Sequence, residues 1–211
     1  MPRSRRAGGG AAVPGEAYVA PKLIRLEQAE NLIAAAGYAV QLGVPLNRHV
    51  TIMWERAGIV GRVQDYQREF LQLMSKWLIY HGTRPAYCWA IENGQLNGLH
   101  GHIVAHVPPA LFKAFRVMLN RWLTRLGGSV DRGTIKVTRV RYGTRDGHQL
   151  NAIKGLVKYI LKGLEHQAGE LIGVRVNPYA AGMVVGKRIG FSQSLGPTAR
   201  ARSTTSPPLA A

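Results

Sequence analysis

Residues 86–107, AYCWAIENGQLNGLHGHIVAHV, constrain the fold more than any other stretch of the chain. Two segments with the residue types of strands flank NGQLNG, whose Asn and Gly residues favour a turn. A connection this short joins antiparallel neighbours, because parallel strands need a long crossover. The stretch therefore predicts an antiparallel hairpin near the centre of the chain.

The segments around the hairpin alternate between strand and helix patterns. Residues 48–55 and 134–143 have the β-branched content or the alternation of strands. Apolar residues recur at helical spacing in four further segments: residues 23–43, 63–82, 108–128 and 150–165. From residue 48 the order is strand, helix, strand, strand, helix, strand, helix, which is the split βαβ arrangement. We therefore expect an α+β fold of the ferredoxin-like type, an antiparallel sheet with helices packed on one face.

Charge is the strongest global signal. The chain carries 28 Lys and Arg against 11 Asp and Glu, a formal net charge of +17. A domain this basic usually binds a polyanion, and nucleic acid is the first candidate. A structural binder of nucleic acid would have the same charge, so the charge indicates a partner and not a reaction. A metal hydrolase of small substrates is disfavoured, because this charge does not serve that task.

The expected organisation is one folded domain between two ragged ends. Residues 1–16 are expected to form a disordered basic arm, residues 17–195 the domain, and residues 196–211 a disordered tail. Cys88 is the only cysteine, which excludes an internal disulfide and a cysteine-based zinc site. No apolar run approaches the roughly 18 residues of a membrane span, and the start lacks the apolar core of a signal peptide. We therefore expect a cytoplasmic protein with no membrane partner.

Three histidines recur on the second strand of the hairpin. Because a strand has a side-chain period of two, His100, His102 and His106 point to the same side. His100 and His102 are close enough to hold one metal ion, and Glu92 at the end of the preceding strand can add a carboxylate. This mixed set suits Mg²⁺, Mn²⁺ or Zn²⁺. The sequence leaves open whether Glu92 or His106 is the third ligand, and whether the histidines are simply solvated. His49 is expected on the surface or at a strand start, and it faces the site if its alternation matches.

A second pair of chemical groups lies in the segment YILK. Tyr159 and Lys162 are three residues apart, so they share one face of the helix expected over 150–165. A tyrosine hydroxyl is a poor nucleophile until a cation or a polarised phosphate assists it, and Lys162 supplies such a charge. The alternative is a packed tyrosine beside a solvated stripe of Lys154, Lys158 and Lys162.

Taken together, these residues resemble the motifs of the HUH endonucleases, and among them the rolling-circle replication initiators. The three motifs occur in order over residues 45–165: HVTIMW around Thr51, LHGHIVAHVP, and YILK. Gly101 stands where the family often has a hydrophobic residue. Gly155 lies one helical turn before Tyr159, so a second tyrosine is missing. A single tyrosine that follows the histidines resembles initiators or single-tyrosine transposases and not the conjugative relaxases.

The resemblance implies a reaction and a set of roles. His100, His102 and Glu92 would bind Mg²⁺ or Mn²⁺, and Tyr159 would attack a phosphate of single-stranded or hairpin DNA. The products would be a 5′-phosphotyrosine and a free 3′-hydroxyl that primes rolling-circle replication, with Lys162 neutralising the transferred phosphate. The chain has no phosphate loop of the Gly-x-x-x-x-Gly-Lys-Ser/Thr type, so a host helicase is a further candidate partner.

Cations near the predicted nucleophile helix, and in the Gly-rich segment 186–197, are expected to contact the DNA backbone. They are Arg139, Arg141, Arg145, Lys154, Lys158, Lys187 and Arg188. Segment 186–197 is expected to be an extended arm along nucleic acid or a surface loop. Two alternative functions stay open: a single-tyrosine transposase, against which Lys162 is the only signal, and a non-catalytic basic nucleic-acid-binding module.

Overall fold

A computed structural model describes residues 23–140, 148–176, 182 and 184–205, so the expected arm over 1–16 lies outside the described residues. The strands are β1 (Arg48–Met53), β2 (Tyr87–Gly94), β3 (Gly98–Ala105), β4 (Ile135–Arg139) and β5 (Ile189–Phe191). The helices are α1 (Leu26–Gln41), α2 (Val63–Tyr80), α3 (Phe112–Arg125), α4 (His148–Ile160), α5 (His166–Ile172) and α7 (Pro197–Thr205). Two 3₁₀ turns are η1 (Pro109–Leu111) and η2 (Gln193–Leu195). None of the described helices combines the length and the apolar character needed to cross a membrane.

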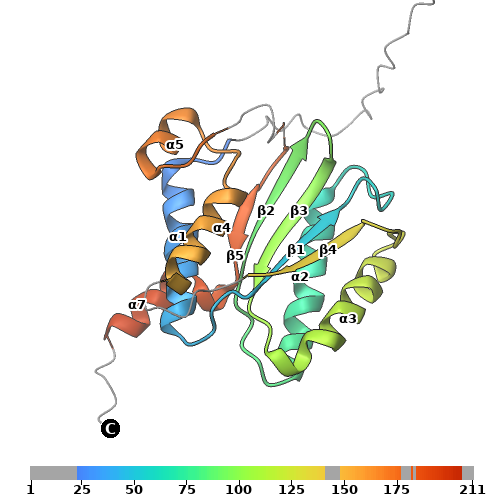
Figure 1. Ribbon diagram of the computed structural model, residues 1–211, viewed down its shortest axis with the longest axis horizontal. Helices are drawn as coiled ribbons and strands as arrows, with labels where there is room; N and C mark the ends of the chain where they lie inside the picture. Colours follow the sequence, from blue (N-terminus) through green and yellow to red (C-terminus); the bar gives the residue numbers. More distant parts are fainter. Residues whose placement is uncertain (1–22, 141–147, 177–181, 183, 206–211) are drawn as a thin grey trace, which may run out of the picture.

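The strands form one antiparallel sheet in the order β4-β1-β3-β2-β5 (Figure 1). The connectivity β1-α2-β2-β3-α3-β4 places β3 between β1 and β2, which is the split βαβ topology. The predicted α+β, ferredoxin-like fold is therefore confirmed. β5 adds a strand at the β2 edge, where Ile189 pairs with Ala90. The expectation of an arm or loop over 186–197 is wrong for Ile189–Phe191, because these residues form β5 and Ile189 is buried in the core beside β2.

Helices cover both faces of the sheet, and not one face as expected. On one face, α2 and α3 pack on strand residues that include Val50, Ile52 and Ile103. On the other face, α1 and α4 pack on Cys88 and Val104. Because successive strand residues point to opposite sides, β2 and β3 supply apolar side chains to both layers. A chain with two apolar sheet faces must bury both, and the helices outside the βαβ unit cover the second.

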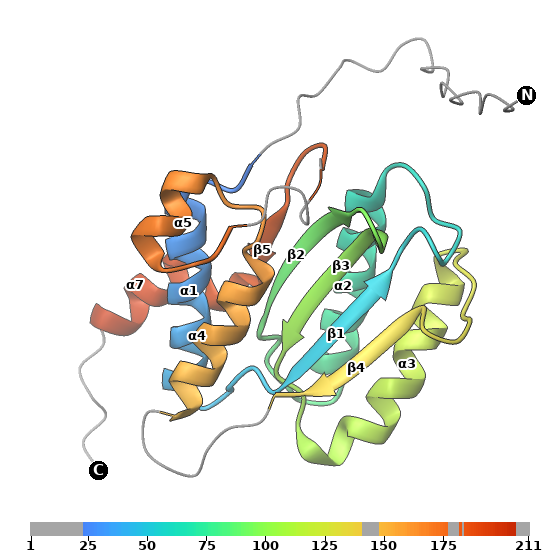
Figure 2. The same ribbon diagram turned by 45° about the horizontal axis from the view of Figure 1, so that its top comes forward.

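The second helical layer leaves part of its face uncovered. In Figures 1 and 2, α1, α4, α5 and α7 gather beside β5 and β2, and none of the helices that the structure describes lies over β1 and β4 on this side. The side chains that β1 and β4 present here are mostly polar: His49, Thr51, Lys136 and Thr138. The uncovered half of the face is therefore suited to contact with a ligand.

The expected disordered tail over 196–211 is wrong for residues 197–205, which form α7. Tyr38 of α1 donates a hydrogen bond from its hydroxyl to the carbonyl of Ala199, at 3.1 Å. Arg200 donates to Asn31 Oδ1 at 2.7 Å and to the carbonyl of Leu195 at 2.9 Å. The contacts with Tyr38 and Asn31 of α1 are long-range, and they order a segment whose composition alone predicts disorder. Residues 206–211 lie outside the described part of the chain.

Gly101 has a packing explanation. It lies on β3 and faces the α2 layer, where the indole nitrogen of Trp54 donates to Gln67 Oε1 at 3.2 Å. A Cβ at position 101 would lie 2.8 Å from that indole nitrogen and would also collide with Gln67 Oε1. The glycine therefore makes room for a buried polar pair on the opposite face of β3 from His100 and His102.

We expect Gly101→Val to lower the free energy of unfolding by about 1–3 kcal/mol, because the added carbons overpack the Trp54–Gln67 pair. Urea unfolding followed by tryptophan fluorescence measures this change. Gly155→Ala is the matched control: nothing lies within 4 Å of a Cβ there, and alanine should stabilise α4 by about 0.5–1 kcal/mol. A Gly101→Val variant as stable as the wild type contradicts this packing.

Candidate active site

The β2–β3 register brings a carboxylate and two imidazoles together. Glu92 pairs with His100 and Ala90 pairs with His102, so Glu92, His100 and His102 project from the same face. All three are buried, with exposed fractions of 2%, 4% and 4%. Glu92 Oε2 lies 3.5 Å from His100 Nε2, and Glu92 Oε1 lies 3.7 Å from His102 Nε2. The predicted group is present, and its ligand atoms all lie within 4.8 Å of one another, close enough to hold one metal ion.

The hydrogen bonds of this group fit a divalent cation. His100 Nδ1 lies 2.8 Å from the carbonyl of Gly98 and must donate to it, which leaves a lone pair on His100 Nε2. Glu92 Oε1 and His102 Nε2 are buried and have no hydrogen-bond partner among the described residues. An unsatisfied buried polar atom costs about 1–3 kcal/mol, and a bound ion would offset that cost. Two imidazole nitrogens and one carboxylate suit several divalent ions, so these three residues fit a bound divalent metal ion.

The charges of the group are in the states that metal binding requires. Burial by itself would raise the pKa of Glu92, but His100, His102 and the Lys162 ammonium outweigh it and lower that pKa to about 2. Burial lowers the pKa of His102, and Glu92 only partly opposes this. Near neutral pH the carboxylate is therefore ionised and the His102 imidazole is neutral. Both can donate electron pairs to a cation.

His49 and Thr51 of β1 complete the group on its other side. His49 Nε2 lies 3.0 Å and Thr51 Oγ1 lies 3.2 Å from His102 Nδ1. Burial, followed by the positive potential of neighbouring groups such as Lys136, lowers the pKa of His49 to about 4. His49 is therefore neutral near pH 7. It lies near the start of β1 and faces the site, as its alternation allowed, and not the surface. The alternation of His49 with Thr51 was the available signal, but only the β1–β3 pairing shows what this face meets.

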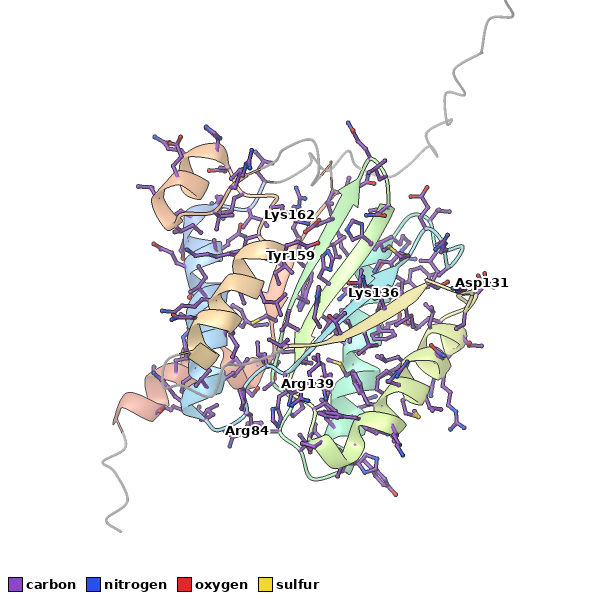
Figure 3. All side chains as sticks on the ribbon, in the orientation of Figure 1. Arg84, Asp131, Lys136, Arg139, Tyr159 and Lys162 are labelled. Atoms are coloured by element: carbon purple, nitrogen blue, oxygen red, sulfur yellow. The ribbon has the colours of Figure 1, made fainter. Side chains whose placement is uncertain are left out.

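Tyr159 and Lys162 lie next to the Glu92–His100–His102 group, and Figure 3 shows the two beside each other near the end of α4. The expectation that they share a helix face is wrong, because α4 ends at Ile160 and Lys162 lies in the turn that follows. Lys162 Nζ nevertheless lies 3.7 Å from the centre of the Tyr159 ring and 3.8 Å from Glu92 Oε2. The Tyr159 ring centre is 6.0 Å from that of His102, and the side chain is 50% exposed. The phenol is thus both close to the Glu92–His100–His102 group and accessible.

These groups line one open cavity of about 800 Å³. Its walls come from β1, β3, β4, the end of α4 and the tip of the β2–β3 hairpin. Besides the residues described above, the lining includes Met53, Gly94, Gln95, Leu96, Asn97, Lys136, Thr138 and Leu156. Lys136 on β4 is a cation of the cavity that we did not predict, and it lies across the cavity from Lys162 (Figure 3). The sequence signal for it was its alternation on the last strand of the βαβ unit.

The predicted DNA-contacting cations are not in the cavity, as far as they are described. Arg139 lies two residues after Val137 and four after Ile135 on β4, so all three point to the same side of the sheet. Ile135 and Val137 pack against the α2–α3 layer, so Arg139 points to that side. Lys154 is exposed and Lys158 is partly buried on α4, and neither lines the cavity. Arg141 and Arg145 lie outside the described residues.

The two cations before β5 have different positions. Lys187 is exposed, with its ammonium 5.9 Å from the centre of the Trp89 ring. Arg188 is only 4% exposed, so its expected role as a surface contact to DNA is wrong. Its guanidinium lies against Gly163, and burial lowers its pKa while Glu92 opposes that change. Arg188 therefore belongs to the packing behind the site.

His106 is separate from the group. Its Nδ1 donates a hydrogen bond to the carbonyl of Pro45, at 2.8 Å, and it is not among the clustered ligand atoms. The choice that the sequence left open between Glu92 and His106 is thus decided by geometry in favour of Glu92.

Comparisons of the chain with protein-family models, with curated proteins and with solved structures found no match. The conclusions about function therefore rest on the geometry and chemistry of the site.

We expect Mn²⁺ to stabilise the protein. At a free ion concentration 100 times Kd, binding adds about 2.7 kcal/mol to the free energy of unfolding. Glu92→Gln removes the anionic ligand at nearly constant volume, and less than about 1 kcal/mol of that gain should remain at the same concentration. Chemical unfolding with Mn²⁺ and with EDTA measures both values. Glu165→Gln, which changes an exposed glutamate, should keep the full gain. An equal gain in both variants would exclude this site.

Proposed function

We propose that the protein is a metal-dependent, HUH-type endonuclease and strand transferase that nicks single-stranded DNA through Tyr159. One observation carries the proposal: an accessible phenol and a buried Glu–His–His group meet in one cavity, and Lys162 contacts both. These groups come from β2, β3 and the end of α4, so the tertiary structure has to assemble them. A tyrosine packed for stability alone would not be half exposed beside metal-ligating side chains.

The charge around the cavity supports a polyanionic substrate. Lys136 and Lys162 line it on opposite sides, and the whole chain has a net charge of +17. Cations in a partly closed site attract phosphates and position a nucleic-acid backbone. On this face no described helix covers β1 and β4 (Figure 2), and the open cavity that these strands line gives an extended strand access to Tyr159.

The reaction is a transesterification at one phosphate. The Tyr159 oxygen bonds to phosphorus while the bond from phosphorus to the 3′ oxygen breaks, and the phenolic proton is balanced by the new 3′-hydroxyl. Lys162 lies beside the phenol, where it neutralises charge on the transferred phosphate. A bound Mg²⁺ or Mn²⁺ supplies Lewis-acid stabilisation of the charge on the phosphate oxygens. The 5′-phosphotyrosine conserves the bond energy, so the strand can be rejoined without ATP.

The free 3′-hydroxyl can prime synthesis, so we propose initiation of rolling-circle replication as the biological use. Lys162, three residues after Tyr159, supports this choice over a single-tyrosine transposase. The proposed partners are an origin in single-stranded or hairpin form and a host helicase that unwinds the duplex.

The test uses single-stranded oligonucleotides that carry candidate origin hairpins, labelled at either end, with Mn²⁺ or with EDTA. The 3′-labelled fragment should migrate with the protein on a denaturing gel, and the 5′-labelled fragment should be released with an extendable 3′ end. Tyr159→Phe should abolish the adduct, because it removes the attacking oxygen. Tyr80→Phe, at an 85% exposed tyrosine outside the cavity, should leave the adduct unchanged.

Two other outcomes separate the alternatives. Binding that is equal in EDTA, with no adduct on any substrate, would replace the enzyme by a non-catalytic binding module. Cleavage restricted to the hairpin ends of a mobile element would replace the initiator by a single-tyrosine transposase.

A further inference from the structure

We propose that His49 and Thr51 are positioning residues, which hold His102 in the tautomer that can bind a metal ion. This inference deepens the proposed function, because it concerns the same metal-ligating group. It assigns a role to β1 beyond its place in the sheet.

The contacts come from strand pairing. Thr51 is the β1 residue directly opposite His102, and His49 lies two residues earlier on the same face. The rings of His49 and His102 are 5.1 Å apart between centres and inclined by 39°. Both neighbours therefore approach His102 from the β1 side, through its Nδ1 atom, while Glu92 lies on the Nε2 side.

The position of the proton on the His102 ring decides whether this side chain can bind a metal ion. A neutral imidazole has one N–H and one lone pair, on different nitrogens. If Nδ1 carries the proton, it donates to His49 Nε2 or Thr51 Oγ1, and Nε2 keeps its lone pair for a cation. If Nε2 carries the proton, the N–H points at Glu92 and blocks coordination. An N–H on Nδ1 has an acceptor at 3.0 or 3.2 Å, whereas an N–H on Nε2 would face Glu92 Oε1 at 3.7 Å, beyond hydrogen-bond distance. This difference in the partner of the N–H favours the first state.

His100 provides an internal comparison. Its Nδ1 meets the carbonyl of Gly98, which can only accept, so the backbone alone fixes its tautomer. His102 meets a ring and a hydroxyl, each of which can donate or accept. The tautomer of His102 therefore depends on side chains, and substitutions can change it without altering the ligands.

The first test is the tautomer itself. Long-range ¹H–¹⁵N spectra of the metal-free wild type should show His102 with its proton on Nδ1. In the double variant His49→Phe/Thr51→Val, which keeps shape but removes both acceptors, the proton should move to Nε2. A wild-type His102 with its proton on Nε2 would overturn the inference, whether or not the variant folds.

The second test is the affinity for Mn²⁺ by calorimetry. The double variant should bind about 10- to 100-fold more weakly, the effect expected when the partner of a metal-ligating histidine is lost. His49→Gln combined with Thr51→Val should recover most of the affinity, because the amide oxygen can accept from Nδ1. Thr124→Val, at an exposed residue of α3 outside the cavity, makes the same change of side chain away from His102 and should bind as the wild type does.

The outcomes separate this inference from the proposed function. An unchanged Kd in the double variant overturns the positioning role only. A loss of affinity that follows a lower melting temperature of the metal-free protein, without recovery by glutamine, also overturns it, because it indicates general destabilisation. A wild type that binds no Mn²⁺ overturns the metal site and the proposed enzyme together. Metal binding and tautomer as expected, but no covalent adduct, would overturn the nuclease and support the positioning role.

Discussion

The pairing of β2 with β3 is the constraint on which the rest of the site depends. It sets Glu92 opposite His100 and Ala90 opposite His102, and the pairing of β1 with β3 then places Thr51 on the other side of His102. Because strand side chains alternate, a slip of one residue would move Glu92 to the α2 and α3 side and leave the histidines without a carboxylate. The same register places Gly101 over the Trp54–Gln67 pair, so packing on the opposite face also favours it.

The two faces of the sheet differ: one is buried in the core, and the other carries the candidate site. The α2–α3 face is covered by an apolar layer and supplies much of the core. The other face is covered by α1 and α4 only beside β2 and β5, so Glu92, His100 and His102 lie at the boundary of a helical layer (Figure 1). Burial there strengthens electrostatic interactions, while the uncovered β1–β4 half admits a large ligand.

Lys162 lies beside both Glu92 and Tyr159, and so joins the buried Glu–His–His group to the phenol. A buried carboxylate is costly unless a positive charge compensates it, and the ammonium near Glu92 provides part of that compensation. The same ammonium lies over the Tyr159 ring. The end of α4 at Ile160 makes this geometry available, because the turn redirects residue 162 toward the sheet.

The sequence by itself determined the strands and helices of the βαβ unit, the hairpin, and the residue types Glu92, His100, His102, Tyr159 and Lys162. Those features follow from local periodicity and turn residues, which act within a few positions of the chain. Tertiary structure decided the rest: the register that joins Glu92 to the histidines, the approach of His49 to His102, the burial of Arg188, and the ordering of β5 and α7. The hairpin register depends on the exact turn that joins β2 to β3, which the residue types alone do not fix. The other features depend on contacts between segments far apart in sequence, whose pairing no local pattern encodes.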